Sequence, residues 1–212
     1  MIEITNLYKQ YVKEYYTLYN INIIFNANTF ILGDDNSGID CLFRILSKIE
    51  KNFDGQILID GQNIKQIKDK NLQISYIPKE PYLFNTTIEK NLYYPLKIRK
   101  INKKIAKNII NDAISNYNLN NFENKIKKLN YSQKKIITLI RAIIHKPKYI
   151  LIENFFKDLD KEYFDLANKI ISDAKKDSII ILGEETPEFE NYKDFKTIKL
   201  NNGSICKDEK KE

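Results

Sequence analysis

Hydrophobic and polar positions alternate regularly at the start of the chain. Residues 2–7 and 18–26 switch between apolar and polar side chains and are rich in β-branched and aromatic residues, which predicts two strands. The intervening segment is expected to be a connection that contains four tyrosines: Tyr8, Tyr11, Tyr15 and Tyr16. The chain is therefore expected to open with a pair of strands.

Short apolar runs predict seven further strands: 29–33, 56–60, 74–77, 149–152, 178–182, 195–200 and 204–206. The runs at 149–152 and 178–182 are almost continuously apolar, which is typical of strands buried on both faces of a parallel sheet. The last two runs are separated by Asn-Asn-Gly and predict a terminal hairpin. The charged tail at 207–212 is expected to fray.

Between residues 85 and 146 the apolar positions recur at helical spacing. One amphipathic stripe is predicted from four isoleucines that lie three or four residues apart with lysines between them: Ile98, Ile101, Ile105 and Ile109. A second helix is expected at 134–145, ended by Pro147. Helices are also expected near 40–49 and 161–175. The pattern predicts an α/β domain with a helical insertion.

The segment Ile31–Leu46 combines a strand end, a polar turn and the start of a helix. Its turn matches both glycines, Gly33 and Gly38, of G-x-x-x-x-G-K-[ST], the pattern of a loop that cradles phosphate at a helix N-terminus. In this chain the lysine and the hydroxyl residue of that pattern are replaced by Ile39 and Asp40. The sequence therefore predicts the glycine positions of a phosphate loop without the lysine and hydroxyl side chains of the pattern.

Further acidic side chains in the loop oppose the binding of phosphate. The loop also carries Asp34 and Asp35, and a like-charge contact at about 4 Å costs roughly 1 kcal/mol in water and about 4 kcal/mol near a protein surface. A triphosphate in the usual position would therefore meet repulsion. The candidate nucleotide-binding residues of the loop are Gly33, Asp34, Asp35, Asn36, Ser37, Gly38, Ile39, Asp40 and Cys41.

Composition narrows the class of protein. The 212 residues suit one domain with a sizeable core, and no apolar stretch approaches the roughly 20 residues of a membrane helix. The N-terminus has no signal-peptide pattern, and Cys41 and Cys206 form no metal or redox spacing, so a cytoplasmic setting is expected. The net charge of +7 is spread over interleaved lysines, which favours a solvated surface over a nucleic-acid interface.

Several segments, taken in order, resemble the nucleotide-binding domain of ABC transporters over nearly the whole chain. After the phosphate loop, the resemblance is carried by Gly55–Gly61 (GQILIDG), Tyr76–Phe84 (YIPKEPYLF, like a Q-loop) and Leu129–Gln133 continuing to Arg141-Ala-Ile-Ile144 (like the signature and its helix). It continues with the strand 149–152 and Leu159-Asp160, similar to Walker B and the D-loop, and with 178–184, similar to the strand into the H-loop.

The resemblance implies a P-loop NTPase (RecA-like) core of the ABC-cassette type, with N-terminal antiparallel strands and an inserted helical subdomain. It implies one domain over 1–212, with a core at about 1–84 and 147–206, a helical and signature subdomain at about 85–146, and a tail at 207–212. It also implies ATP and Mg²⁺ as the family's cofactors.

Transferred to this sequence, the family's catalytic pattern is substituted at nearly every position. Ile39 replaces the lysine, Lys79 replaces the Q-loop glutamine, and Glu153 stands at the Walker B aspartate. Asn154 replaces the glutamate that polarises water, and an amide cannot accept a proton at neutral pH. Glu184 replaces the H-loop histidine. The resemblance therefore implies little or no ATP hydrolysis.

Of the remaining site positions, those of the signature are altered and two others match the family. The signature-like residues are Leu129, Asn130, Tyr131, Ser132 and Gln133, in which a tyrosine and a serine stand at the two glycines. Asp160 matches the D-loop aspartate, and Tyr11 matches the aromatic residue that stacks on adenine. Asp40 and Glu153 could hold a divalent ion. Lys79 could pair with Asp40 or Glu184.

Three functions are compatible with these residues. The first is a degenerate ATP-binding subunit of an ABC transporter-like complex, cytoplasmic and peripheral at the inner face of the membrane. Its partners would be a transmembrane permease subunit and a second cassette, in a homodimer or a heterodimer. The second is a divergent but active Mg-ATPase that energises a transporter. The third is a soluble regulatory cassette without a transporter, with no nucleic-acid partner favoured.

Overall fold

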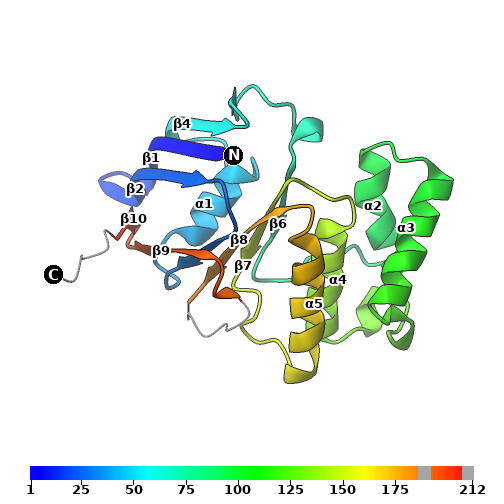
Figure 1. Ribbon diagram of the computed structural model, residues 1–212. Coiled ribbons are helices and arrows are strands. Elements are labelled where there is room, and N and C mark those ends of the chain that lie inside the picture. The colour runs from blue at the N-terminus through cyan, green and yellow to red at the C-terminus, as the bar shows by residue number, and fades with distance from the viewer. Residues whose placement is uncertain (186–191, 207–212) are drawn as a thin grey trace.

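A computed structural model of the chain describes residues 1–185 and 192–206, and the predicted tail at 207–212 lies outside the described residues. Two sheets and five α-helices make up this part of the molecule (Figure 1). The smaller, antiparallel sheet has the order β2 (Tyr15–Phe25), β1 (Ile2–Val12), β4 (Asp54–Ile59), β5 (Gln62–Asn63). The larger has the order β10 (Ser204–Ile205), β9 (Lys196–Asn201), β3 (Thr29–Leu32), β8 (Ile179–Glu184), β7 (Tyr149–Glu153), β6 (Ile74–Ile77).

Five strands of the larger sheet run parallel, and β10 folds back on β9 as an antiparallel hairpin. All five residues of β7 are buried, and alternate residues enter two different cores. Tyr149 and Leu151 face one core, whereas Ile150 and Ile152 face the other. The prediction of strands buried on both faces is thus confirmed for β7 and β8.

Helices separate the layers. Helix α1 (Ile39–Leu46) packs in one core between the two sheets. Helices α4 (Tyr131–Ile143) and α5 (Phe164–Ala174) cover the other face of the larger sheet. Helices α2 (Ile88–Ile98) and α3 (Lys103–Asn116) lie beyond α4, at the end of the molecule away from β9 and β10 (Figure 1). Over the described ranges, no helix has the length and apolar character that crossing a membrane requires.

The predicted tyrosine-rich connection is wrong, because β1 and β2 extend through it to Val12 and from Tyr15. Tyr8 and Tyr16 pack edge to face across the two strands with ring centroids 5.8 Å apart, and Tyr19 joins both at 5.4 and 5.2 Å. Such cross-strand aromatic pairs stabilise an antiparallel ladder. The strands therefore continue where the alternation of apolar and polar residues is lost.

The predicted stripe of four isoleucines is also wrong. Helix α2 ends at Ile98 and α3 begins at Lys103, after Asn102, whose side chain accepts a hydrogen bond from the Lys104 N–H at 2.9 Å. This cap starts a second helix with a new phase, so α3 buries Ala106 and Ile110 instead. Ile98 and Ile105 are left exposed.

Three distant segments meet at the start of α1 without intervening side chains. Gly38 has a φ of 87°, and a Cβ there would lie 2.7 Å from the carbonyl oxygen of Thr17 in β2. A Cβ at Gly203, in the β9–β10 turn, would lie 2.3 Å from the same oxygen. The Gly203 N–H donates to the Ser37 carbonyl at 3.0 Å, and its own carbonyl accepts from Tyr19 at 2.8 Å. Glycine is required because the backbones themselves are in contact.

Gly38→Ala is expected to lower the free energy of unfolding by about 3 kcal/mol, because the left-handed backbone and the contact with Thr17 both oppose a Cβ. Gly61→Ala is the matched control, since Gly61 has a φ of 80° and no neighbouring atom within 4 Å of a Cβ. The control should lose only about 1 kcal/mol. Urea denaturation measures both values, and equal losses would contradict the proposed close contact.

Candidate functional site

The glycine-containing loop follows the carboxyl end of β3 and leads into α1. Its backbone is held by its own side chains: the Ser37 N–H and hydroxyl both donate to the Asp34 carbonyl, at 3.0 and 2.6 Å. The Asn36 N–H donates to the Asp34 carboxylate at 3.0 Å. The Gly33 N–H donates to the carbonyl of Glu184 at 3.1 Å. The loop is therefore joined to the end of β8.

Ile39 and Asp40 stand where the predicted phosphate-loop pattern would have a lysine and a hydroxyl residue. The Ile39 side chain is buried under β8, where a Cβ at Gly183 would lie 2.5 Å from its Cγ2 atom. Asp40 is exposed in the first turn of α1, where a carboxylate interacts favourably with the helix dipole. The chain thus supplies its own negative charge at the helix end that would attract a phosphate.

Lys79 pairs with neither of the acids predicted for it. Its ammonium group lies 3.2 Å from the Asp35 carboxylate, and Asp40 and Glu184 are not its ion-pair partners. The Lys79 ammonium lowers the pKa of Asp35 through this hydrogen bond and its charge. The side chains are 30% and 65% exposed, so the pair adds well under about 1 kcal/mol of stability. The prediction failed because the partner lies in a loop whose shape the sequence does not specify.

Glu153 ends β7 as a buried carboxyl group. The Tyr76 hydroxyl donates to its Oε2 atom. Burial raises the pKa of Glu153, and the charge of Asp40 raises it further, whereas the Tyr76 hydrogen bond acts in the opposite direction. The described part of the chain contains no cluster of three or more His, Cys, Asp or Glu side chains that could hold a metal. Asp40 and Glu153 are therefore two carboxylates without a third ligand among these residue types.

The segment after β7 is braced by a buried carboxyl group on one side. Asn154 has a φ of 39° and donates its N–H to the Gly183 carbonyl at 2.8 Å. The Glu184 side chain is 3% exposed and its Oε1 accepts the N–H groups of Phe155 and Phe156, at 2.7 and 3.3 Å. Burial raises the pKa of Glu184 to about 7, despite these hydrogen bonds. Glu184, which the resemblance predicts at the position of the H-loop histidine, thus acts as an internal hydrogen-bond acceptor.

A buried lysine braces the same segment from the other side. Lys135 of α4 is 1% exposed, and its ammonium donates to the carbonyl groups of Phe155, at 2.8 Å, and of Lys157. Burial lowers the pKa of Lys135, while the charge of Glu184 partly offsets that effect. We refer to Lys135, Glu184 and the backbone they hold, at 155–157, as the buried brace.

Sequence reasoning did not identify Lys135. It lies on the buried face of α4 together with Ser132, Ile136 and Leu139, at helical spacings of three and four residues. The sequence therefore did contain a signal for Lys135, because a lysine on the apolar stripe of a helix indicates a buried cation with partners inside the protein.

The side chains of the signature-like segment are used within the chain. Asn130 and Gln133 form a capping box at the start of α4: the Gln133 N–H donates to the Asn130 side chain at 2.7 Å, and the Asn130 N–H donates to Gln133 at 3.1 Å. The Tyr131 hydroxyl donates to Glu80 at 3.1 Å, and Leu129 is buried.

The signature-like and D-loop-like segments are in direct contact. Buried Ser132 accepts the N–H of Asp160 at 3.0 Å. Tyr11, by contrast, is exposed at the end of β1. Its hydroxyl lies 3.7 Å from the Cys41 sulfur, and the Lys9 ammonium lies 4.5 Å from its ring centroid. The structure thus brings Tyr11 to the start of α1, with a cation against its ring.

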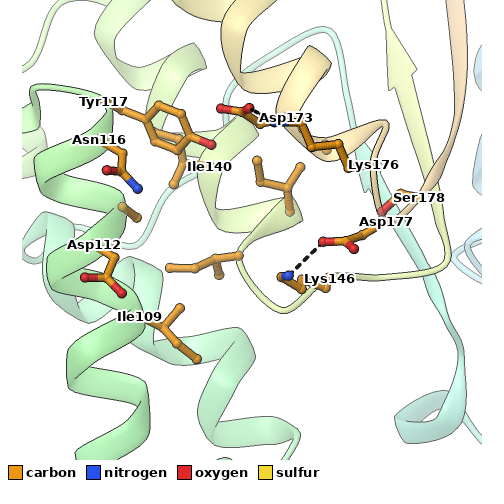
Figure 2. Close-up of a pocket in the computed structure, with 14 residues that line it drawn as sticks. Ile109, Asp112, Asn116, Tyr117, Ile140, Lys146, Asp173, Lys176, Asp177 and Ser178 are labelled. Carbon is orange, nitrogen blue, oxygen red and sulfur yellow. Dashed lines mark hydrogen bonds and ion pairs between the residues drawn. The ribbon is translucent and has the colours of Figure 1, made fainter.

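A separate cleft lies between α3, α4 and the segment that follows α5 (Figure 2). It has a volume of about 450 Å³ and an apolar floor that includes Ile140. Two ion pairs close its rim, Lys146–Asp177 at 2.7 Å and Lys176–Asp173 at 2.8 Å. None of the candidate catalytic, nucleotide-binding or metal-binding residues lines this cleft, so the candidate site is the loop region at the ends of β3, β7 and β8.

Comparison with known proteins gives a consistent match. The family profile described as ABC transporter matches residues 19–156, more than half of the chain. An export ATP-binding/permease protein of Rickettsia typhi is 28% identical over 178 residues, which cover 76% of this chain and 30% of that protein. The bacitracin export ATP-binding protein BceA of Halalkalibacterium halodurans is 29% identical over 184 residues, 80% of this chain and 73% of that protein. The chain thus spans less than a third of the Rickettsia protein.

Solved structures agree in fold. The ATP-binding cassette MJ0796, in a dimeric post-hydrolysis state bound to ADP and phosphate, superposes with a TM-score of 0.82 at 17% identity. The match covers 98% of this chain and 97% of that one. The α/β fold is therefore that of a P-loop NTPase core of the ABC-cassette type, as the sequence predicted.

The raised pKa of Glu184 predicts a specific pH dependence. Its carboxyl group favours the folded state fully when protonated, below its ordinary pKa of 4.5, and that stability is lost as the pH rises through about 7. Relative to Glu184→Gln, the native chain should lose about 3 kcal/mol of unfolding free energy between pH 4.5 and pH 8. The matched control is Glu14→Gln, because Glu14 is an exposed residue of the turn between β1 and β2. Parallel stability curves for the native chain and Glu184→Gln would refute the buried acid.

Lys135→Met is expected to lower the free energy of unfolding by about 2–4 kcal/mol, because two backbone carbonyls lose their donor and Glu184 loses the nearby cation. Lys134→Met removes a neighbouring charge outside the brace and should change stability by less than about 0.5 kcal/mol. Chemical denaturation at pH 7 measures both. Equal losses of unfolding free energy in the two variants would contradict the role of Lys135 in the buried brace.

Proposed function

The chain belongs to the ABC transporter family, and from this premise we propose that it is a degenerate ATP-binding subunit. In this proposal it hydrolyses ATP poorly or not at all and acts as a structural and regulatory partner of a transmembrane subunit. The observation that carries the proposal is the pair Ile39 and Asp40. One side chain is buried under β8 where a cation should reach phosphate, and the other already occupies the positive end of α1.

Phosphoryl transfer depends on positioned positive charge and on bound metal. The residues present fit a magnesium triphosphate poorly. Asp34, Asp35 and Asp40 are acidic where the phosphates would lie, and Lys79 is already paired with Asp35. At the water-polarising position Asn154 cannot act as a base at neutral pH. No catalytic step through ATP or Mg²⁺ is assigned to these groups.

The signature-like segment supports the same proposal. In the family, an ATP site combines the phosphate loop of one cassette with the signature of another. Here Asn130 and Gln133 cap α4, Tyr131 contacts Glu80, and Ser132 binds the backbone of Asp160. A homodimer would therefore contain two defective sites. We infer that a second, intact cassette is the better partner, in a complex at the cytoplasmic face of a membrane.

A groove beside the Q-loop-like segment suits a transmembrane partner. It has a volume of about 250 Å³ and lies between β6, α2 and α4. Tyr82, Phe84 and Tyr94 contribute aromatic side chains, and Tyr82 is 68% exposed. The Arg141 guanidinium donates to the Tyr82 carbonyl at 2.6 Å and lies 5.8 Å from the Phe84 ring. We propose that a cytoplasmic segment of the permease docks in this groove, between a core at about 1–84 and 147–206 and a helical subdomain at about 85–146.

A divergent active Mg-ATPase is the second candidate. It is favoured by Glu153, a carboxylate at the end of β7, and by the exposed ring of Tyr11 near the start of α1. Against it, Glu153 is buried and bound by Tyr76.

The decisive test is calorimetry of the purified chain with ATP and Mg²⁺. The native chain should show no binding tighter than a dissociation constant of about 1 mM. The double variant Ile39→Lys, Asp40→Ser should bind at least about tenfold more tightly, because it restores a cation and removes a repelling carboxylate. Asp40→Ser alone separates the two effects, and circular dichroism confirms folding of each variant. Micromolar binding by the native chain would sink the proposal and favour the active ATPase.

A further inference from the structure

The turn between α2 and α3 carries an unusual balance of charge. Between Glu89 and Asp112 the chain has seven cationic residues and no acidic one, whereas the whole chain has 35 Lys and Arg against 28 Asp and Glu. Five exposed lysines gather at the end of α2, the connection and the first turns of α3: Lys97, Lys100, Lys103, Lys104 and Lys107. We call these five residues, together with Tyr94, Ile98 and Ile105, the basic corner.

The ammonium groups of the basic corner have no internal partners. Within residues 1–185 and 192–206, none of the five lysine ammonium groups forms an ion pair or a hydrogen bond. Lys103 and Lys104 also lie in the first turn of α3, where the helix dipole disfavours a cation. By contrast, α1 and α2 each place an acid in the first turn, Asp40 and Glu89. A bound anion would pair with these ammonium groups and would offset the unfavourable interaction of Lys103 and Lys104 with the helix dipole.

Apolar side chains lie among these lysines. Ile98 is 47% exposed, Ile105 is 55% exposed and Tyr94 is 45% exposed. Tyr94, Lys97 and Ile98 stand three and four residues apart, so they share one face of α2. In the described part of the chain Ile98 and Ile105 stay exposed, although isoleucine gains stability when it leaves water, whereas the Tyr94 ring packs against Phe84 with ring centroids 4.7 Å apart.

We propose that the basic corner binds the headgroups of an anionic lipid bilayer. Lysines bind the negative surface, and the isoleucine side chains enter the boundary between headgroups and acyl chains. A nucleic acid would use the lysines but gain nothing from exposed isoleucines, and stacking needs more aromatic residues than the single Tyr94.

The position of the corner agrees with the proposed docking groove. Tyr94 belongs to both features, because it lines that groove together with Pro95, and the lysines of the basic corner begin two residues after Pro95, at Lys97. A transmembrane subunit seated in the groove would bring this end of the molecule, far from the β1–β2 hairpin and β9, next to the bilayer (Figure 1). This orientation rests on the proposed function, whereas the charge and the exposed isoleucines do not.

The test is sedimentation of the full chain with vesicles of phosphatidylcholine alone or with 30% phosphatidylserine, at about 0.1 M salt. The chain should bind the anionic vesicles only. Lys100→Gln, Lys103→Gln, Lys104→Gln should weaken the partition coefficient roughly 100-fold. The charge-matched control Lys13→Gln, Lys196→Gln, Lys199→Gln alters exposed lysines of the hairpin and β9 and should weaken it less than about tenfold.

A second pair of variants separates a bilayer from other polyanions. Ile98→Ser, Ile105→Ser should weaken vesicle binding about tenfold without changing retention on a DNA duplex. Equal binding by the lysine triple and its control would overturn the proposal. An unaffected isoleucine variant, with DNA bound as tightly as vesicles, would replace the bilayer by a nucleic acid. Either result leaves the nucleotide-site proposal standing, because that depends on ATP binding alone.

Discussion

The contact of three backbones at the Thr17 carbonyl is the constraint on which the rest of the structure depends. Gly38 of the loop and Gly203 of the last hairpin both approach this oxygen more closely than any side chain would allow. The contact joins the antiparallel sheet, the start of α1 and the edge of the parallel sheet. It gives a structural reason for a glycine at position 38 that does not involve phosphate. The shape of this loop therefore does not depend on a lysine at position 39 or a hydroxyl residue at position 40.

At other positions of the candidate site, too, side chains that differ from the family's catalytic pattern make contacts within the chain. Ile39 packs under Gly183, Tyr131 contacts Glu80, and Lys79 pairs with Asp35. Each of these side chains is engaged within the chain itself. The Ile39 side chain is buried, whereas the contacts of Lys79 and Tyr131 lie at the surface. These internal contacts support the proposal that the chain keeps the fold of a cassette without its nucleotide chemistry.

Much of the fold follows from local patterns in the sequence. The strand at 74–77 has the predicted bounds, the buried parallel pair is present, and the terminal hairpin forms, because apolar periodicity and turn residues act over a few neighbours. The isoleucine stripe at 98–109 failed since one capping residue, Asn102, resets the helical phase. The partner of Lys79 and the burial of Lys135 depend on residues distant in the chain, which periodicity alone does not locate.

The buried brace also couples two positions that are distant in the sequence. Lys135 lies in the interior with the charge of Glu184 offsetting part of the cost of its burial, and both hold the backbone at 155–157. Replacing Glu184 alone leaves a buried cation without its nearby acid, and replacing Lys135 alone removes the cation that faces the carboxyl group. The effects of the two replacements on stability are therefore expected to be non-additive, so that the residue at each position limits which side chains the other position can accept.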